Sequence, residues 1–479
     1  MPLLFATERH AYFYDDATRL VFPTEGYEKE YLEQIEHDHG TLDMEVLNRE
    51  PRLQELSQKI KQYGLFVTPQ PQTPVFTQEQ MEERLRKEGI AHLCLTLTEA
   101  CNFRCKYCVY SDHYGLNSGY SNEQMSLDTA KAAVDLYMSN NMESIQYNPN
   151  LSISIGFYGG EPLLNFSTIQ GVVQYVEEKY KSYFSRMVFS VTTNGYLLDR
   201  KRLQFLLDHH FAISVSLDGD QEEHDRNRIT VSGKPTFDIV FNNLLMLDEM
   251  YREQSAHNDE IYPYSLLITY DNISDLSRLN KFFAQHPNLD SRIARITRVK
   301  DLNSDYYNNS EQADNLVIQK QQASKDEFIG LVRAGRPLTN FIRKYVQGLI
   351  FEPSMNINYA HNPLGGLCVP GISKLTVDVN GQFHMCEKIS PQYPIGDIHQ
   401  GLNMEQQTQI LNKGLSVIRE KCQDCKVRSL CNICYVTLEQ EGAEFGIPEG
   451  YCDYFQDWMK SAFSLYYSLL EENPELSIF

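Results

Sequence analysis

The sequence of 479 residues is poor in basic side chains and has no long apolar run. Its 43 Lys and Arg residues stand against 64 Asp and Glu, which gives a formal net charge of −21. A chain this acidic repels a phosphate backbone, so we expect no nucleic acid partner. A membrane span needs about 18 consecutive apolar residues, and we expect none. The first twenty residues mix charged with apolar side chains, unlike a signal peptide, so we expect a cytoplasmic protein.

Tryptophan is nearly absent, with a single residue, but the chain has 30 Tyr and 24 Phe, and apolar residues make up 42% of it. This composition supports a large core and excludes a chain that is disordered throughout. At about 150 residues per domain, the length predicts roughly three domains.

Cysteine is missing from residues 109–367, although the chain has 11 cysteines. All but Cys94 fall in two groups, one before this gap and one after it. In a large chain without a signal peptide, clustered cysteines are typical of metal ligands rather than of disulfides. The sequence therefore predicts two metal-binding regions.

The expected organisation has four parts, which are residues 1–75, 85–310, 311–367 and 368–479. The first part combines three short apolar runs with helical patterns at 26–37 and 50–63, which is typical of a winged-helix-like unit. Three prolines within residues 69–74 predict a stiff linker at its end. The part at 311–367 is a bridging region.

Strands alternate with helical patterns over residues 90–300, which indicates an α/β fold with a parallel sheet or barrel. The predicted strands are His92–Thr98, Leu151–Tyr158, Met187–Thr193, Phe211–Leu217, Ser265–Tyr270 and Arg292–Val299. Helices are predicted at Asn122–Met138, Ser167–Ser182 and Phe237–Tyr251.

Small polar residues occupy one face of several of these strands, as in Ser190 and Thr192 or Ser214 and Ser216, while the other face is apolar. A closed barrel usually fills its interior with branched apolar side chains. The pattern therefore favours an open barrel whose inner face holds a ligand. The alternative is a sheet with one wet face.

The first cysteine group is Cys101-x3-Cys105-x2-Cys108, directly after the first predicted strand of this region. Three thiolates on one short loop suit three irons of a [4Fe–4S] cluster and leave the fourth iron open. A structural zinc site is the alternative, but it needs a fourth ligand nearby, and only His113 follows closely.

This motif, with Tyr107 before its last cysteine, resembles the radical S-adenosylmethionine (SAM) enzymes. Further matches follow in order: Gly159-Gly160-Glu161-Pro162 after the second strand, Asn194 after the third, and Ser214-Val-Ser216-Leu-Asp218 at the end of the fourth. The resemblance implies a partial (β/α)6 barrel that binds SAM and cleaves it to a 5′-deoxyadenosyl radical. It implies that Glu161 accepts from the SAM ammonium and that Ser216 and Arg228 hold its carboxylate or ribose. The implied SAM-binding set is Tyr107, Gly159, Gly160, Glu161, Pro162, Asn194, Ser214, Ser216, Asp218 and Arg228.

The second cysteine group resembles the SPASM extension of peptide-modifying radical SAM enzymes. Its order is Cys368, Cys386, Cys422, Cys425, Cys431, Cys434 and Cys452. Here two residues precede the fourth cysteine of the quartet, where the family has three. Two zinc sites are the alternative, but zinc ribbons separate their cysteine pairs by more than the five residues found here.

The SPASM resemblance implies two auxiliary [4Fe–4S] clusters, and so three in all. It assigns a distal cluster to Cys422, Cys425, Cys431 and Cys452, and a nearer one to Cys368, Cys386 and Cys434. Seven cysteines serve eight positions, so one iron of the nearer cluster stays open. Asn362 stands where sulfatase-maturing relatives place a further cysteine. Cys94 is the only spare cysteine, and we expect it in the core.

Thioether-forming peptide maturases resemble this arrangement, and in them a substrate thiolate is thought to occupy the open auxiliary iron. We therefore expect an enzyme that forms Cys-derived thioethers in a ribosomally made precursor peptide. Residues 1–75 are expected to bind the leader of this peptide. Glu387 is the candidate catalytic base. A flavodoxin- or ferredoxin-like donor is expected to supply electrons. The alternatives are carbon–carbon crosslinking, epimerisation or sulfatase-type Cys or Ser oxidation. From another class, the alternative is a non-catalytic Fe–S or zinc protein.

Overall fold

The structure is a computed structural model of the chain and describes residues 2–37, 42–66, 72–114, 119–299, 306, 315–350, 366–440 and 442–475. Asn362 lies outside the described residues, as do most of the polar stretch at 300–314 and part of the linker at 67–71. Within the described residues, no helix is long and apolar enough to cross a membrane.

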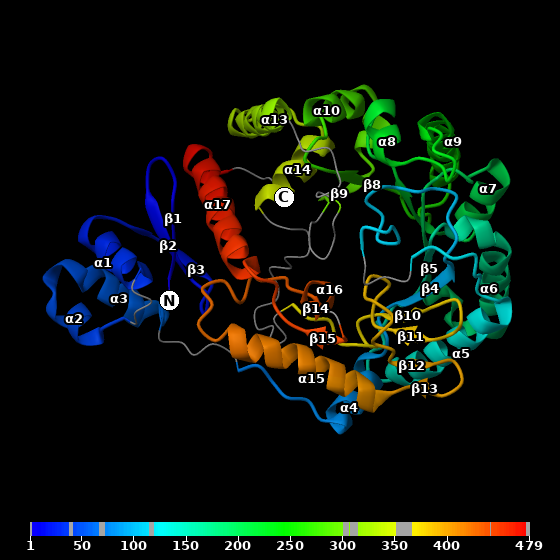
Figure 1. The fold of residues 1–479 in the computed structure, drawn as a ribbon, viewed down its shortest axis with the longest axis horizontal. Coiled ribbons are helices and arrows are strands. Elements are labelled where there is room, and N and C mark those ends of the chain that lie inside the picture. The colour runs from blue at the N-terminus through cyan, green and yellow to red at the C-terminus, as the bar shows by residue number, and fades with distance from the viewer. Residues whose placement is uncertain are drawn as a thin grey trace.

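An eight-stranded sheet forms the centre of the molecule, with the strand order β11-β10-β4-β5-β6-β7-β8-β9 (Figure 1). Six of these strands are parallel and follow one another in the chain: β4 (Leu93–Thr98), β5 (Ile153–Gly159), β6 (Met187–Thr193), β7 (Ala212–Ser216), β8 (Ser265–Tyr270) and β9 (Ile293–Arg298). The predicted α/β fold with six parallel strands is confirmed, and the strand boundaries differ from those predicted by at most two residues.

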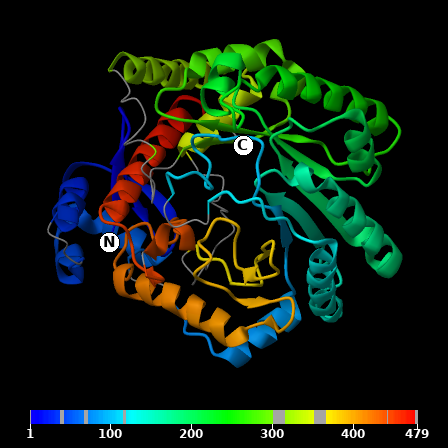
Figure 2. The same cartoon turned by 45° about the vertical axis from the view of Figure 1, so that its right-hand side comes forward.

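Helices cover the outer face of these strands (Figures 1 and 2). They are α5 (Leu127–Ser144), α6 (Phe166–Lys179), α7 (Arg200–Asp208), α8 (Gln221–Asn227), α9 (Phe237–Ser255), α10 (Leu276–Gln285) and α11 (Pro287–Asp290), with the 3-10 turns η2 (Pro162–Asn165) and η3 (Lys181–Arg186). The apolar strand residues Ile155, Val191 and Val215 are fully buried against this layer.

The other face of the sheet keeps its small polar side chains only partly buried, as at Ser154, Ser190, Ser214 and Ser216. Since the helices lie on the apolar side, this polar face turns toward the middle of the molecule. The C-terminal region lies across that middle in Figure 1. The arrangement fits a partial barrel with a polar interior.

The N-terminal unit has an antiparallel sheet of β1 (Leu3–Ala6), β2 (Ala11–Asp15) and β3 (Leu20–Thr24), followed by α1 (Gly26–His37), α2 (Met44–Arg49), η1 (Pro51–Leu53) and α3 (Gln54–Tyr63). Its own core includes Phe13, Leu32, Leu47 and Leu56. The helical pattern predicted at 50–63 is found as the 3-10 turn η1 followed directly by α3, and Pro51 stands in the first turn, where proline fits.

The C-terminal region extends the barrel sheet and then folds over its open side (Figure 1). Its elements are β10 (Leu375–Val377), β11 (Phe383–His384), β12 (Gly396–Asp397), β13 (Gly401–Leu402), α15 (Met404–Lys421), α16 (Tyr435–Leu438), β14 (Glu439–Gln440), β15 (Glu444–Phe445) and α17 (Tyr451–Glu472). Before it come α13 (Asn315–Arg333) and α14 (Asn340–Ile350), while α4 (Gln78–Glu88) precedes the barrel. Strand β10 pairs in parallel with β4, with Thr376 beside Cys94.

Candidate active site

The loop that carries Cys101, Cys105 and Cys108 follows β4 and is held by its backbone. Arg104 N donates to Ile229 O at 2.8 Å, and Lys106 N donates to Asn227 O at 3.2 Å. Phe103, fully buried, anchors the loop in the core. The loop therefore runs along the segment that follows α8.

The three thiols of this loop lie close enough to interact. Burial raises the pKa of Cys101 and of Cys105 to about 12, and the charge of Cys108 adds to each rise. Thiols with such raised pKa values are converted to thiolates by a bound metal rather than by the solvent. The structure thus brings together the three predicted ligands of the first cluster.

Gly159 and Gly160 allow the end of β5 to approach this loop. A Cβ atom at Gly159 would lie 2.2 Å from Thr98 O, and one at Gly160 would lie 2.3 Å from Ala100 O. Gly160 N donates to Thr98 O at 2.8 Å. A side chain at either position would push β5 away from the backbone just before Cys101.

Glu161 is buried, and its carboxylate is held by three donors. It accepts from Leu163 N at 3.1 Å, from Thr193 Oγ1 at 2.7 Å and from Asn194 N at 2.8 Å. Burial raises the pKa of Glu161, and the bond from Asn194 N opposes that rise. A carboxylate has about four acceptor positions, so one remains for a ligand.

Asn194 connects the end of β6 to the first cysteine of the loop. Its side-chain Nδ2 donates to Asn102 Oδ1 at 2.8 Å and lies 3.8 Å from Cys101 Sγ. The predicted SAM residues of β5 and β6 therefore meet at the cysteine loop. Pro162 starts the turn η2 directly behind Glu161.

Tyr107, Asp218 and Arg228 form a buried triad at the other side of the loop. Tyr107 Oη donates to Asp218 Oδ2 and accepts from Arg228 Nη1 at 2.6 Å. Burial raises the pKa of Asp218, and the charge of Arg228 opposes that rise. The same positive charge opposes the burial-driven rise in the pKa of Cys105. Arg228 thus faces the cysteine loop.

The two serines of β7 that were predicted to bind SAM lie on the half-buried inner face. Ser214 Oγ lies 2.9 Å from Ser265 Oγ of β8, so these hydroxyls bond to each other. Ser216 follows two residues later on the same face.

Four cysteines of the C-terminal region line one hollow. Its lining is Ile418, Cys422, Cys425, Val427, Arg428, Cys431, Ile433, Ile447, Tyr451, Cys452 and Phe455. Cys422 is the C-cap residue directly after α15 and Cys452 lies in the first turn of α17, so these helix ends bring the set together. The predicted distal ligands are therefore neighbours.

Cys368, Cys386 and Cys434 lie nearer to the barrel. Partial burial, and then the charge of Cys434, raise the pKa of Cys368. Cys386 follows β11, which reaches β4 through β10. Burial and the charge of Glu387 raise the pKa of Cys94, whose side chain lies on the face of β4 shared with Thr96. The core position expected for Cys94 is therefore found, but it is close to the second cysteine group.

Glu387 forms an ion pair that the sequence does not reveal. Lys374 Nζ lies 2.8 Å from Glu387 Oε2, and the glutamate side chain is largely buried. Lys374 lowers the pKa of Glu387 against the effect of burial. Lys374 stands 13 residues before Glu387, and only the pairing of β10 with β11 brings them together.

The donor sets of all three groups contain thiols without histidine. Among the described residues, no three His, Cys, Asp or Glu side chains are close enough to share a single metal ion. A single zinc ion would draw its ligands to about 2.3 Å from one centre. An Fe–S cluster attaches its thiolates to different irons, so sets of three or four thiols without histidine fit such clusters.

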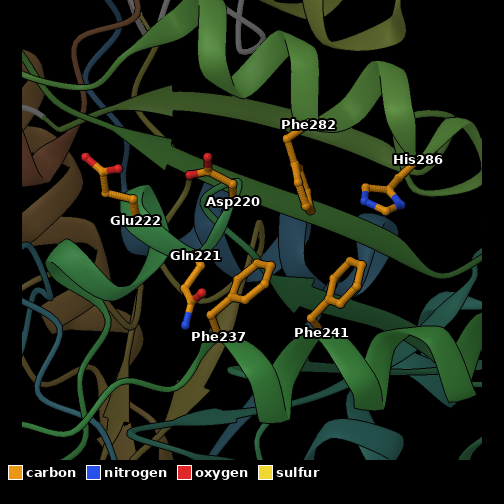
Figure 3. A pocket seen from close by; sticks show the side chains of 7 residues that line it. All are labelled: Asp220, Gln221, Glu222, Phe237, Phe241, Phe282 and His286. Atoms are coloured by element: carbon orange, nitrogen blue, oxygen red, sulfur yellow. The ribbon is translucent and has the colours of Figure 1, made fainter.

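A separate hollow lies between α8, α9 and α10 (Figure 3). It is lined by Asp220, Gln221, Glu222, Phe237, Phe241, Phe282 and His286. Phe237 and Phe241 stack with ring centres 5.2 Å apart. Arg278 pairs with both acidic side chains on its rim. None of the predicted cofactor residues lines this hollow.

An α/β sheet with three cysteines after its first parallel strand, beside a buried Gly-Gly-Glu turn, defines a class of SAM-cleaving enzymes. Residues 95–261 match the Radical SAM superfamily. The chain thus contains a radical SAM domain, and enzymes of this superfamily use a [4Fe–4S] cluster together with SAM.

The curated relatives and solved structures that are similar to the chain include the following three. The radical SAM cyclopropyl synthase TigE of Paramaledivibacter caminithermalis is 22% identical over 77% of this chain and 73% of the relative. A cysteine-type anaerobic sulfatase-maturating enzyme of Clostridium novyi is 25% identical, over 37% of this chain and about half (48%) of the relative. The structure titled native anSMEcpe with bound AdoMet and Cp18Cys peptide superposes with a TM-score of 0.56 at 19% identity, over 79% of this chain and 99% of that one. This superposition shows a shared fold.

Proposed function

We propose that the chain is a radical SAM–SPASM peptide maturase that forms thioether crosslinks in a ribosomally made precursor peptide. The observation that carries this proposal is the arrangement of the seven C-terminal cysteines. Four of them line one hollow, while Cys368, Cys386 and Cys434 lie toward the barrel. The set of Cys368, Cys386 and Cys434 offers three ligands for the four irons of one cluster, which leaves a place for a thiolate of the substrate.

The protein residues have separate tasks in this mechanism. When bound, SAM and the clusters supply a 5′-deoxyadenosyl radical and accept one electron. Glu161 and Asn194 orient the amino acid end of SAM, and Arg228 faces its carboxylate or ribose. Glu387, whose carboxylate pairs with Lys374, is proposed to take the proton that a substrate thiol loses.

The leader peptide is proposed to bind to the N-terminal unit as an additional strand of the β1–β3 sheet. Strand β3 is an edge of that sheet, and in the described part of the chain no strand pairs with its outer side. Hydrogen exchange measured with and without leader peptide tests this proposal. We expect slower exchange at Leu20–Thr24, and protection confined to other elements would contradict it.

The reaction itself is tested with reconstituted enzyme, SAM, a reductant and a Cys-containing precursor. Thioether formation removes two hydrogen atoms per crosslink and makes that cysteine resistant to alkylation. A carbon–carbon crosslink removes the same mass but leaves the thiol reactive, and epimerisation leaves the mass unchanged. A product with an alkylatable cysteine would overturn the thioether proposal. Failure to release 5′-deoxyadenosine would overturn the peptide maturase proposal altogether.

Carbon–carbon crosslinking, epimerisation and oxidation of Cys or Ser remain the second candidate, because relatives that match over more than two thirds of this chain are named for different activities. One is named a cyclopropyl synthase, and another a serine-type sulfatase-maturating enzyme that covers 69% of this chain. In addition, Glu387 directly follows Cys386, which fits a base for oxidation of Cys or Ser as well as for thioether formation. The mass change and the alkylation test together separate these reactions. Oxidation of Ser leaves the cysteine alkylatable, and conversion of Cys to an aldehyde removes the sulfur and so changes the mass by more than two hydrogen atoms.

A further inference from the structure

The loop Lys426–Leu430, between two predicted ligands of the distal cluster, lies against the N-terminal unit and its linker. We call these five residues the docking loop. Its contacts are Lys426 with Glu36 at 2.8 Å, Val427 with the cluster of Leu3, Phe5 and Tyr14, Arg428 with Thr73 at 2.6 Å, and Ser429 with Asp16. Every residue from 426 to 429 thus meets a partner from the first 73 residues.

Asp16 makes the most extensive of these contacts. It follows the last residue of β2 and is 3% exposed. Its carboxylate accepts from Ser429 N at 3.0 Å and from Ser429 Oγ at 2.7 Å. Tyr14 Oη donates to the same oxygen at 3.1 Å. The carboxylate therefore fixes the middle of the docking loop, four residues after Cys425 and two before Cys431.

The charge of Asp16 also reaches the predicted ligands. Burial raises the pKa of Cys425 to about 12, and the charges of Cys422 and Asp16 add to that rise. A cluster that gains an electron becomes more negative, so a fixed carboxylate nearby disfavours its reduction. Asp16 therefore has both a geometric and an electrostatic connection to this hollow.

We propose that Asp16 is a positioning residue of the distal cluster, so that the N-terminal unit completes the binding site of that cluster and lowers its reduction potential. The inference rests on the proposed function insofar as it takes Cys422, Cys425, Cys431 and Cys452 to hold an auxiliary cluster. It gives the N-terminal unit a second task besides leader binding.

The chain offers a matched control in the neighbouring residue. Asp15 is also 3% exposed, but its carboxylate accepts from Thr18 N at 3.0 Å and from Phe66 N at 3.3 Å, both inside the N-terminal unit. Asp15→Asn therefore removes a buried carboxylate next to Asp16 without touching the docking loop.

The test compares Asp16→Asn with Asp15→Asn in the full-length chain with Cys101, Cys105 and Cys108 changed to Ala, so that only auxiliary signals remain. Redox titration followed by electron paramagnetic resonance needs neither SAM nor peptide. We expect Asp16→Asn to raise the midpoint potential of one auxiliary cluster. The reduced-to-oxidised ratio of that cluster at a fixed potential should rise about three- to tenfold, while Asp15→Asn leaves it unchanged.

Loss of iron to a chelator gives a second measurement. Asp16→Asn should lose iron faster than Asp15→Asn, and Ser429→Ala should do so without a shift in potential, since it keeps the carboxylate. Equal potentials and equal iron loss in Asp16→Asn and Asp15→Asn would overturn the inference and leave the proposed function standing. If the parent chain bound only one auxiliary cluster, both would be overturned.

Discussion

At the scale of single residues, Glu161 connects the parts of the SAM-binding end. Its carboxylate joins the turn after β5 to the end of β6, and Asn194 continues the connection to Cys101. Three donors hold the side chain in place, so the remaining acceptor position has a fixed direction. A carboxylate held in this way loses little entropy when it binds an ammonium group.

Replacing Glu161 by Gln should weaken SAM binding about tenfold or more, because a charge-assisted hydrogen bond is worth roughly 1.5–3 kcal/mol. Equilibrium binding of SAM to the reconstituted enzyme measures the effect. Glu123→Gln is the matched control, since Glu123 is exposed and lies beside the end of β4. If both variants bound SAM equally well, Glu161 would be structural only.

His92, just before β4, should make stability depend on pH. Burial and the charge of Lys374 lower the pKa of His92 to about 4, and its ring bonds to Ser154 at 2.7 Å. In the unfolded chain, His92 takes up a proton near pH 6.5. The stabilisation that comes from keeping His92 neutral is therefore complete above pH 6.5 and is lost as the pH falls toward 4.

Between pH 7.5 and pH 5.5, wild type should therefore lose more stability than His92→Gln, by on the order of 1 kcal/mol. Melting temperatures of the anaerobic protein at the two pH values measure this difference. The exposed His399→Gln serves as the control and should follow wild type. An equal drop in melting temperature in all three proteins would show that His92 does not cause the pH dependence of stability.

At the scale of elements, the site depends on how closely the ends of β4 and β5 approach. The absence of a side chain at Gly160 lets Glu161 N donate to Ala100 O at 3.0 Å, one residue before the cysteine loop. The same contact would be impossible with any other residue unless one strand moved.

Gly160→Ala should therefore prevent assembly of the first cluster, with the loss of about four irons per chain and of SAM cleavage. Iron assay and electron paramagnetic resonance should show the auxiliary signals unchanged. Gly348→Ala in α14 is the control, because nothing lies within 4 Å of its added Cβ. Full iron content in Gly160→Ala would show that the loop tolerates the displacement.

Strands were easier to predict than the elements that complete the site. Six strands follow from their alternating faces, but α7, α8 and α10 were not predicted, since helices of ten residues or fewer show too little periodicity. Strands β10 and β11 have three and two residues and no pattern of their own. Consequently the cysteine motifs could be found from the sequence, whereas the Lys374–Glu387 pair and the contact of Asp16 with Ser429 could not.

At the scale of the whole molecule, the N-terminal unit is not a detachable module. It packs on α17 and the docking loop, and Phe5 stacks on Phe463 with ring centres 5.1 Å apart. The described end of the linker, residues 72–76, is fixed as well, since Arg419 donates to Pro74 O at 3.0 Å. If the unit served only to hold the leader, removal of residues 1–75 would affect precursor binding alone, but these contacts indicate a wider effect.

We expect the chain without residues 1–75 to keep SAM cleavage but to lose about four of its roughly twelve irons, together with precursor binding. Iron and zinc assays on anaerobically reconstituted protein measure this loss. Full-length chain that saturates near four irons and contains zinc would contradict the three-cluster assignment. Truncated chain with an unchanged iron content would show that the N-terminal unit is dispensable for the clusters.

The parallel pairing of β10 with β4 has a consequence for the order in which the chain folds during synthesis. Strand β4 leaves the ribosome early, but its partner at Leu375–Val377 is made only after all the other barrel strands. Until then one edge of the barrel stays open, and an open edge of parallel strands invites pairing with other chains. The nascent barrel therefore stays open at this edge until Leu375–Val377, which lie within the second cysteine group, have been made.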